Sequence, residues 1–344
     1  MRSLPLKTLF VFAFMGTLLV ALMALQRDRL AAGYENVVST VKSTAASAAE
    51  ASKSLPLPGF ANSEPTAPTD NYISICLAVK DQRLDLPEFL HHHYYNMGVG
   101  HFFIMDDGSQ PPLSEMTEEE LTIPRSAIEF HYFKPEKHVR WMQYTMYNTC
   151  AHIARNASTT TNTTWMAFID ADEFIDAPGP QTLREVLEDF DRIEAIGGVA
   201  LNWRIHSSNG HLTRQPSAIA AYTECVYDDV EHNGNGTNNR HVKSIVKVNL
   251  FKQPRDPHSF YLTENHITVG ENGDEVNSAL RTPITRNRLA LHHYALKSKA
   301  EYEEKMVRGS GMSNHKGWEV WDLYENTNPH EECTEMLRWA PKSS

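Results

Sequence analysis

The sequence predicts an α/β fold, in which a mostly parallel central sheet carries helices on both faces. Short apolar runs rich in β-branched and aromatic residues alternate with segments of helical periodicity. Strands of a parallel sheet are covered on both faces, so they appear in a sequence as nearly continuous apolar runs. Acidic clusters follow two of these runs, and ligands of such sheets bind outside the carboxyl ends of the strands. The candidate site is therefore expected at one edge of the sheet.

The predicted elements alternate along the first part of the globular region. Strands are expected at residues 72–79, 101–105, 127–133, 165–169 and 199–205. Helices are expected at residues 86–98, 138–154 and 182–195. Pro87 and Gly98 stand at the two ends of the first helix, as helix termini prefer. No GxGxxG or GxxxxGKS/T pattern occurs, so dinucleotide-binding and P-loop functions lose their main support.

The first 70 residues predict a membrane anchor followed by a spacer. Residues 9–25 form an uncharged apolar run, which is at the short end for a spanning helix. They predict a signal anchor behind a cytoplasmic tail (1–8), with a flexible stem (26–70) and a lumenal domain (71–344). A cleaved signal peptide is the alternative, although the run exceeds a usual signal-peptide core and no clean A-x-A site follows it. We therefore expect a single-pass type II protein of the Golgi or endoplasmic reticulum membrane.

Composition limits the function classes. The chain has 344 residues, is 41% hydrophobic and carries a formal charge of −11, which argues against a nucleic-acid partner. An acidic protein that binds a phosphorylated ligand usually needs a divalent cation between the two. The four cysteines include no CxxC pair, and in an oxidising compartment they permit one or two disulfides, with three full pairings open. Cys76, inside the first predicted strand, is expected to be a small buried apolar residue.

The segment Asp170-x-Asp172 directly follows the apolar strand 165–169. In an extended chain the side chains of residues i and i+2 point to the same side, so both carboxylates can reach one hard divalent ion such as Mn²⁺ or Mg²⁺. The pattern alone is weak, because the chain contains a second copy at Asp189 and Asp191. That copy falls in a predicted helix, where such residues point apart, and is expected to be a surface feature.

Asp106 and Asp107 end the strand 101–105 and open a DDGS turn. Acidic side chains at that place could accept hydrogen bonds from ribose hydroxyls or a base N–H, whereas a tight turn that only closes the strand is the alternative. Lys243 and Lys247 belong to the apolar segment KSIVKV and are expected on its solvated face rather than at a phosphate.

An ordered series of motifs resembles glycosyltransferase family 92 and its family 2-like relatives, which have the GT-A fold. The motifs are DLPEFLHHHYYNMGVGHFFIMDDGS (85–109), WMAFIDADEFI (165–175), NWRIHSSNGH (202–211), KSIVKV (243–248) with HSF (258–260), and LHHYALKSKAEYEEKMVRG (291–309). Each motif is weak alone, but the order is specific and covers residues 72–330. The sequence departs from the family at Arg204-Ile205-His206, which bears on acceptor specificity, and at the doubled His292-His293.

The resemblance implies roles for particular residues. The metal would be held by Asp170, Asp172 and His293, with His292 as the fallback ligand. The nucleotide sugar would be bound by residues at the first two strand ends and near the last motif: Val79, Lys80, Asp81, Asp106, Asp107 and Lys297, the last of these near the diphosphate. An inverting reaction also needs one carboxylate base to deprotonate the acceptor hydroxyl. The candidates for this base are Glu173, Asp274 and Glu275.

These expectations together describe an inverting glycosyltransferase. It would transfer a sugar, with galactose as a family-level expectation, from a UDP-sugar to a glycan acceptor in the presence of Mn²⁺ or Mg²⁺. One alternative is a lumenal glycan-binding or scaffolding protein of the same fold. Another is a metal-dependent phosphohydrolase, which would need a second cluster of carboxylates and histidines for two ions. The oligomeric state stays open.

Overall fold

A mixed sheet organises the residues that the structure, a computed structural model, describes: 67–156, 162–312 and 317–341. These residues belong to one compact unit, Pro58–Ser344. The predicted cytoplasmic tail, anchor and nearly all of the stem lie outside the described residues. Within the described ranges, no helix has the length and apolar character that crossing a membrane requires.

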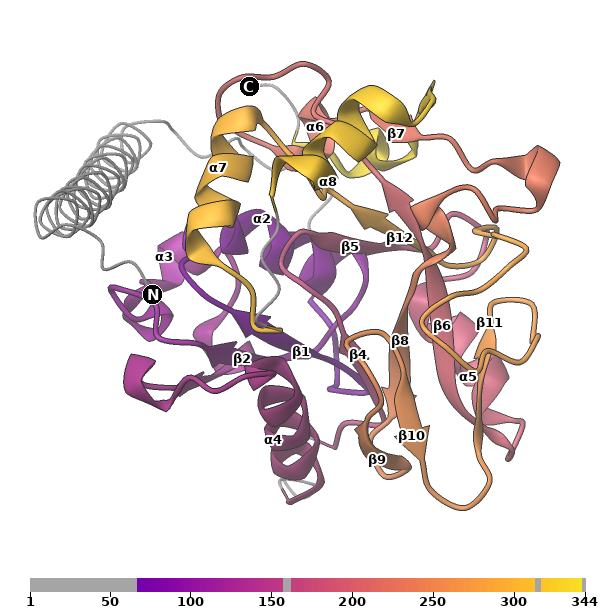
Figure 1. Cartoon of the computed structure of the whole chain (residues 1–344). Helices are drawn as coiled ribbons and strands as arrows, with labels where there is room; N and C mark the ends of the chain where they lie inside the picture. The colour runs from indigo at the N-terminus through magenta and orange to yellow at the C-terminus, as the bar shows by residue number, and fades with distance from the viewer. Residues whose placement is uncertain (1–66, 157–161, 313–316, 342–344) are drawn as a thin grey trace, which may run out of the picture. The chain divides into compact units, whose positions relative to one another are not determined.

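Nine strands of the described chain form the central sheet, in the order β3-β2-β1-β4-β8-β6-β12-β5 with β11 beside β6 (Figure 1). Their bounds are β1 Ile73–Val79, β2 His101–Asp106, β3 Ile128–Tyr132, β4 Trp165–Phe168, β5 Glu173–Asp176, β6 Ile196–Ile205, β8 Val242–Lys247, β11 Ile267–Gly270 and β12 Ala290–His293. Two small pairs lie apart from it: β9 Phe251–Pro254 with β10 Phe260–Leu262, and β7 Glu224–Val226 with β13 His330–Glu332.

The sheet is parallel in its first half and mixed in its second. Strands β3, β2, β1 and β4 are parallel neighbours, and β12 and β11 both run parallel to β6. Strand β8 is antiparallel to β4 and β6, and β5 is antiparallel to β12. The α/β class and all five predicted strands are confirmed. The short strand β5 was not predicted, because it begins and ends on acidic residues and lacks an apolar run.

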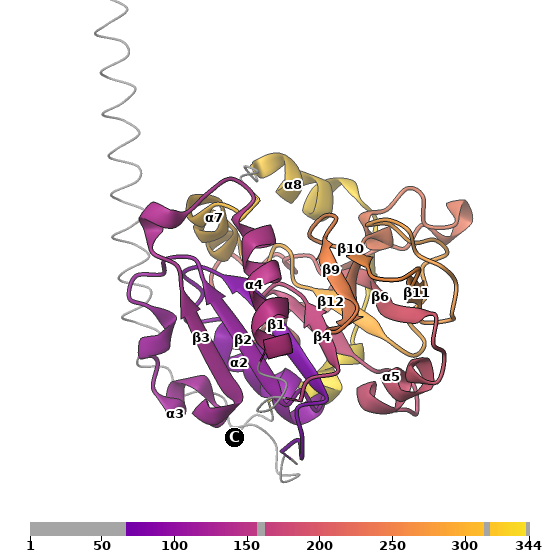
Figure 2. The ribbon, with the colours of Figure 1, turned by 90° about the horizontal axis from the view of Figure 1, so that it is seen from below.

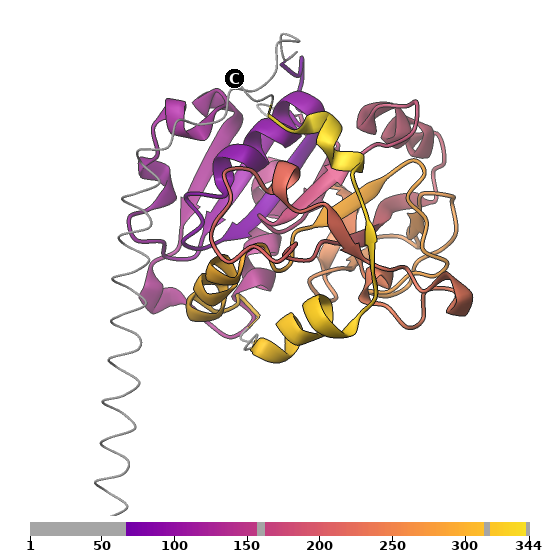
Figure 3. The ribbon, with the colours of Figure 1, turned by 90° about the horizontal axis from the view of Figure 1, so that it is seen from above.

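The helices cover both faces of the sheet. Their bounds are α2 Leu86–His91, extended by a π-helical turn His92–Asn96, α3 Glu118–Leu121, α4 Met142–Asn156, α5 Leu183–Asp191, α6 Ala218–Ala221, α7 Lys299–Arg308 and α8 Trp318–Asp322. Seen from below, α4 lies in front of strands β1 and β2, whereas α2 lies in front when the sheet is seen from above (Figures 2 and 3). The three predicted helices are therefore present, although each differs from prediction by a few residues at one or both ends.

Alternation along β1 explains this two-sided packing. Ile75 and Leu77 belong to the apolar core that includes Phe89 of α2, whereas Cys76 points to the other face. There Cys76 forms a disulfide with Cys150 of α4. The expected burial of Cys76 is confirmed, whereas its disulfide was not predicted, since the sequence could not show which cysteine faces it.

A second disulfide joins Cys225 of β7 to Cys333, the residue after β13. All four cysteines are thus paired, and one of the three pairings left open by the sequence is selected. His206 lies beside this disulfide, with Nδ1 at 3.6 Å from Sγ of Cys333. The grouping of one histidine and two cysteines is therefore a packed disulfide rather than a metal site.

Candidate active site

A cavity of about 390 Å³ opens at the carboxyl ends of β1 and β4. These parallel strands are neighbours, so the segments that follow them meet at one edge of the sheet. Among the residues that line the cavity are five predicted from the sequence: Val79, Lys80, Asp107, Asp170 and Asp172. The structure thus brings the two acidic strand ends to a single site, as the sequence analysis expected.

Asp170 is held from two sides. Nε2 of Gln143, in the first turn of α4, donates to Oδ1 of Asp170 at 3.0 Å. Nζ of Lys243 donates to Oδ2 at 2.8 Å. Lys243 is only 1% exposed, so the prediction that it lies on a solvated face was wrong. Burial by itself would lower the pKa of Lys243, but the charges of Asp170 and Glu173 hold that pKa well above its ordinary value.

Asp172 lies deeper, at 6% exposure, between β12 and α7. Its Oδ2 accepts a hydrogen bond from Nζ of Lys305 at 2.5 Å, and its Oδ1 lies 3.8 Å from Nε2 of His293. The backbone N–H of Tyr294, the residue after β12, donates to the carbonyl oxygen of Asp172 at 2.8 Å. This backbone bond ties the end of β12 to the Asp-x-Asp segment.

The two adjacent histidines of β12 point to opposite sides of the sheet, as successive strand residues do. His293 faces Asp172, whereas Nδ1 of His292 lies 2.9 Å from Nε2 of His206. Burial lowers the pKa of His292 well below its ordinary value, so this ring is neutral at physiological pH. The geometry therefore selects His293 over His292 as the histidine beside the carboxylate pair.

Glu173 follows the pair directly but is fully buried beneath it. Its Oε2 accepts a hydrogen bond from the backbone N–H of Asp170 at 2.9 Å and lies 3.5 Å from Nζ of Lys243. Burial raises the pKa of Glu173 to about 8, with Asp170 and Asp172 adding to this shift and Lys243 opposing it. Glu173 is not among the residues that line the cavity.

The other two candidate bases, Asp274 and Glu275, lie in the turn after β11. Both oxygens of Asp274 accept hydrogen bonds from Arg281, at 2.7 Å each, and Glu275 forms a β-bridge with Val269. A Cβ at Gly270 would fall 1.9 Å from Nε of Arg281, so only glycine leaves room for this pair. Neither carboxylate lines the cavity, and the identity of the base stays a prediction.

The strand-end residues Asp106 and Asp107 have different roles in the structure. The oxygens of Asp106 accept the backbone N–H groups of Ser109 and Leu113, both at 2.9 Å, so this carboxylate closes the turn. Asp107 lines the cavity, and its Oδ2 lies 2.8 Å from Nδ1 of His138. Burial raises the pKa of Asp107, and His138 opposes that shift. Asp81, two residues after β1, contacts this turn, since its Oδ1 accepts the N–H of Gln110 at 3.0 Å.

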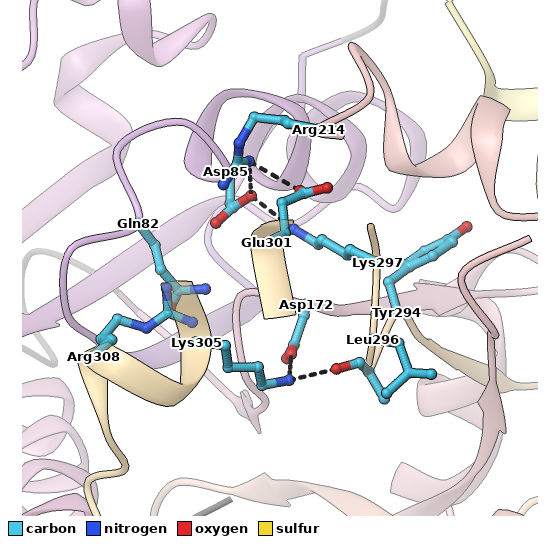
Figure 4. Close-up of a pocket in the computed structure, with 11 residues that line it drawn as sticks. Gln82, Asp85, Asp172, Arg214, Tyr294, Leu296, Lys297, Glu301, Lys305 and Arg308 are labelled. Carbon is cyan, nitrogen blue, oxygen red and sulfur yellow. Dashed lines mark hydrogen bonds and ion pairs between the residues drawn. The ribbon is translucent and has the colours of Figure 1, made fainter. Parts of the chain in front are cut away.

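Lys297 lies in a smaller, charged cavity of about 20 Å³ beside the first (Figure 4). Its Nζ donates to Oδ1 of Asp85 at 2.7 Å, and Arg214 donates to the same oxygen at 2.8 Å. Asp172 and Lys305 line both cavities. The lysine expected near the diphosphate is therefore engaged in a buried ion pair and does not line the larger cavity.

Helix α7 contributes residues that the sequence analysis did not assign to the site. Lys305 and Arg308 line the open cavity together with Gly309, Ser310 and Gly311. The helix begins at a capping box, in which Ser298 and Glu301 satisfy each other's backbone N–H groups. This Ser-x-x-Glu signal is visible in the sequence and could have placed Lys305 and Arg308 on the last turn of a helix. The capping signal does not, however, show which way that last turn faces.

Comparison with known proteins identifies the class to which this fold and site belong. The family model "Glycosyltransferase family 92" matches residues 72–250, just over half of the chain. The chain belongs to glycosyltransferase family 92, which confirms the resemblance drawn from the sequence motifs. The match includes Asp107, Asp170 and Asp172 but ends before β12 and α7.

A curated relative bears the same family name. A glycosyltransferase family 92 protein of Oryza sativa subsp. japonica is 23% identical over an alignment of 301 residues, and the alignment covers 84% of this chain and 41% of the rice protein. The chain therefore matches less than half the length of this relative.

A solved structure, core-mannan synthase A of Aspergillus fumigatus in its Mn/GDP form, is 9% identical and covers 56% of this chain and 63% of its own. Its TM-score is 0.27, which is too low to show a shared fold.

Proposed function

We propose that this protein is an inverting, nucleotide-sugar-dependent glycosyltransferase of GT-A fold. It would transfer a hexose from a UDP-sugar, with galactose as the first candidate, to a hydroxyl group of a glycan acceptor. The observation that carries this proposal is the meeting of Asp107, Asp170 and Asp172 at one cavity. Membership of family 92 supports glycosyl transfer as the reaction class.

The donor groups around Asp172 fit a hard divalent ion by their chemistry. Two carboxylates and one imidazole, from Asp170, Asp172 and His293, are ligand types that suit Mn²⁺, and the carboxylates also suit Mg²⁺. A bound ion would offset the negative charge that develops on the diphosphate leaving group. In the present arrangement an ammonium group neutralises each carboxylate, since Lys243 pairs with Asp170 and Lys305 with Asp172.

Side chains of the protein would bind the nucleoside, approach the diphosphate and remove the proton of the acceptor. Val79, Lys80 and Asp107 would bind the nucleoside at the end of β1 and β2, where Asp107 can accept hydrogen bonds from ribose or base. Lys305 and Arg308, which line the same cavity, would provide positive charge for the diphosphate. An acceptor hydroxyl must also lose its proton as it attacks the anomeric carbon, and Glu173, Asp274 and Glu275 stay the candidates for that base.

We also propose that the catalytic domain, residues 71–344, is lumenal and is anchored by residues 9–25 of a type II Golgi or endoplasmic reticulum protein. Two disulfides support an oxidising compartment, because such bonds are rare in the reducing cytosol.

The test is a donor screen on the purified protein with Mn²⁺, comparing the wild type with Asp172→Asn. We expect UDP-sugar hydrolysis and transfer to fall by at least about 100-fold in Asp172→Asn, since the variant lacks one metal-binding carboxylate, while its circular dichroism spectrum stays that of the folded wild type. Asp189→Asn, in the second Asp-x-Asp copy, is the matched control and should keep wild-type activity. Full activity of Asp172→Asn would refute the proposal.

The glycan-binding alternative makes a different prediction. A lumenal glycan-binding protein would not be stabilised by UDP and Mn²⁺, whereas a glycosyltransferase would show a higher melting temperature when both are present. A thermal-shift measurement with UDP, Mn²⁺ and their combination therefore separates the two functions before any acceptor is known.

A further inference from the structure

The ammonium group of Lys305 forms an ion pair with Asp172, a carboxylate that would hold the metal ion. Nζ of Lys305 donates to Oδ2 of Asp172 at 2.5 Å and to the carbonyl oxygen of Ala295 at 2.8 Å (Figure 4). The side chain of Asp172 is 9% exposed and that of Lys305 is 14% exposed. A divalent ion that approaches this carboxylate therefore meets a cation that is already in place.

Lys243 provides an internal contrast. It is 1% exposed, lies between Asp170 at 2.8 Å and Glu173 at 3.5 Å, and lines neither of the two cavities. Lys305 lines both cavities, and the larger one offers about 390 Å³ of open space beside it. Lys243 is thus a fixed counter-charge, whereas Lys305 has room to leave its partner.

The same wall of the cavity is suited to an anion. Arg308 follows Lys305 by three residues on α7, so both cations lie on one side of the helix and both line the cavity. Gly309, Ser310 and Gly311 continue this wall beyond the helix. A diphosphate that enters between this wall and Asp172 would offer Lys305 a new anionic partner within the reach of its flexible side chain.

We propose that Lys305 is an exchangeable counter-ion that couples metal binding to nucleotide binding. Two cations at one carboxylate repel each other, so a metal ion that binds alone must break the pair between Lys305 and Asp172 without replacing it. When a nucleoside diphosphate binds as well, Lys305 moves from Asp172 to the diphosphate. Each ligand then raises the affinity for the other by the same factor, as linkage requires. This inference rests on the proposed function of the site.

The experiment measures Mn²⁺ binding to the full chain by the electron paramagnetic resonance signal of free Mn²⁺, with and without UDP. In the wild type, we expect UDP to increase Mn²⁺ affinity by at least about fivefold. Lys305→Met should bind Mn²⁺ alone at least about fivefold more tightly than the wild type, because the pair between Lys305 and Asp172 need not be broken, and UDP should then add little. Lys299→Met is the matched control, since Lys299 lies on the same helix but contacts the ring of Trp318; it should behave as the wild type does.

A second variant, Lys305→Gln, controls for misfolding of Lys305→Met. Lys305→Gln keeps a donor for the carbonyl oxygen of Ala295 and should show the same change in Mn²⁺ binding as Lys305→Met, with the circular dichroism spectrum of the folded wild type. If neither variant binds Mn²⁺ more tightly than the wild type, or if UDP enhancement persists in both, the inference is wrong while the proposed function stands. A wild type that binds neither Mn²⁺ nor UDP would refute both.

Discussion

Lys297 donates a hydrogen bond to Asp85 at 2.7 Å, and the two side chains are almost fully enclosed, at 10% and 9% exposure. Asp85 directly precedes α2, whereas Lys297 lies between β12 and α7, more than 200 residues further along the chain. Arg214 contacts the same carboxylate at 2.8 Å. Burial alone would raise the pKa of Asp85, but the charges of Lys297 and Arg214 hold it well below its ordinary value. The pair thus fastens the C-terminal segment to the first helix.

Replacement of Lys297 by Met should therefore destabilise the fold. A buried charge that loses every partner costs about 3–5 kcal/mol, and Asp85 would keep Arg214, so the cost should lie below that range but above that of a surface pair. Because the folded-state pKa of Asp85 is depressed, the stabilisation is present above the unfolded value near about 4 and is lost as the pH falls toward the folded value. Urea unfolding at pH 7 and pH 3 should show a difference between wild type and variant that shrinks at the lower pH.

Arg192→Met serves as the control for this prediction. Arg192 pairs with Asp189 on the surface, where the arginine side chain is 75% exposed, and such pairs contribute at most about 1 kcal/mol. A Lys297→Met variant that is no less stable than Arg192→Met, or one whose deficit is the same at both pH values, would contradict the role of the buried pair.

The disulfide between Cys225 and Cys333 closes a loop with a sequence separation of 108 residues. Crosslinks of this span stabilise proteins by about 4–5 kcal/mol in the chain-entropy description. The double variant Cys225→Ser/Cys333→Ser should lose stability of that order in urea unfolding under non-reducing conditions. Dithiothreitol should lower the midpoint of the double variant further, because Cys76–Cys150 remains. A wild-type midpoint that dithiothreitol leaves unchanged would argue against both bonds.

Alanine variants of Asp107 and Asp106 should have different effects, because Asp107 lines the cavity whereas Asp106 closes the turn. Asp107→Ala removes an acceptor that lines the cavity, and we expect affinity for uridine and for UDP to fall by about 10–100-fold, the usual value for a hydrogen bond to a charged group. Asp106→Ala instead leaves two backbone N–H groups without their acceptor, so stability should fall while uridine affinity stays. Calorimetric titration with uridine, together with urea unfolding, checks both. The reverse pattern would show that the turn residue is the ligand contact.

Glu173→Gln tests the candidate base that lies nearest the carboxylate pair. Glu173 is fully buried and keeps its proton to about pH 8, so we expect the variant to retain kcat within about tenfold, whereas loss of a general base costs about 10²–10⁴-fold. Glutamine also keeps an acceptor for the N–H of Asp170. Asp274→Asn and Glu275→Gln should be measured beside it. A kcat that falls by about 10³-fold only in Glu173→Gln, with KM unchanged, would identify Glu173 as the base after all.

Several parts of the fold and the site could be predicted from local sequence alone. The buried strands β1, β2 and β4 are nearly continuous apolar runs, and α2 has a proline, Pro87, in its first turn. Asp170 and Asp172 come directly after β4, and Asp107 follows β2. Because neighbouring parallel strands end at the same edge, these three carboxylates could be expected together before any coordinates were known.

Other features depend on contacts between segments far apart in the chain. The burial of Lys243 and the choice of His293 over His292 follow from the faces that β8 and β12 present in the assembled sheet. The disulfide pairing follows from the packing of α4 on β1 and of β13 on β7. A periodic pattern gives the side of an element that is apolar, but it does not say which neighbour that side meets.

The sequence by itself therefore determined the α/β class, the acidic strand ends and the family resemblance, because each of these is encoded within a few neighbouring residues. Only the tertiary structure decided that Lys297 fastens Asp85 and that Lys305 lies on Asp172, since both pairs join segments more than 130 residues apart. Charges at such separations meet only after the sheet has brought α7 to the strand ends. The counter-ions of the site are for this reason a property of the assembled fold.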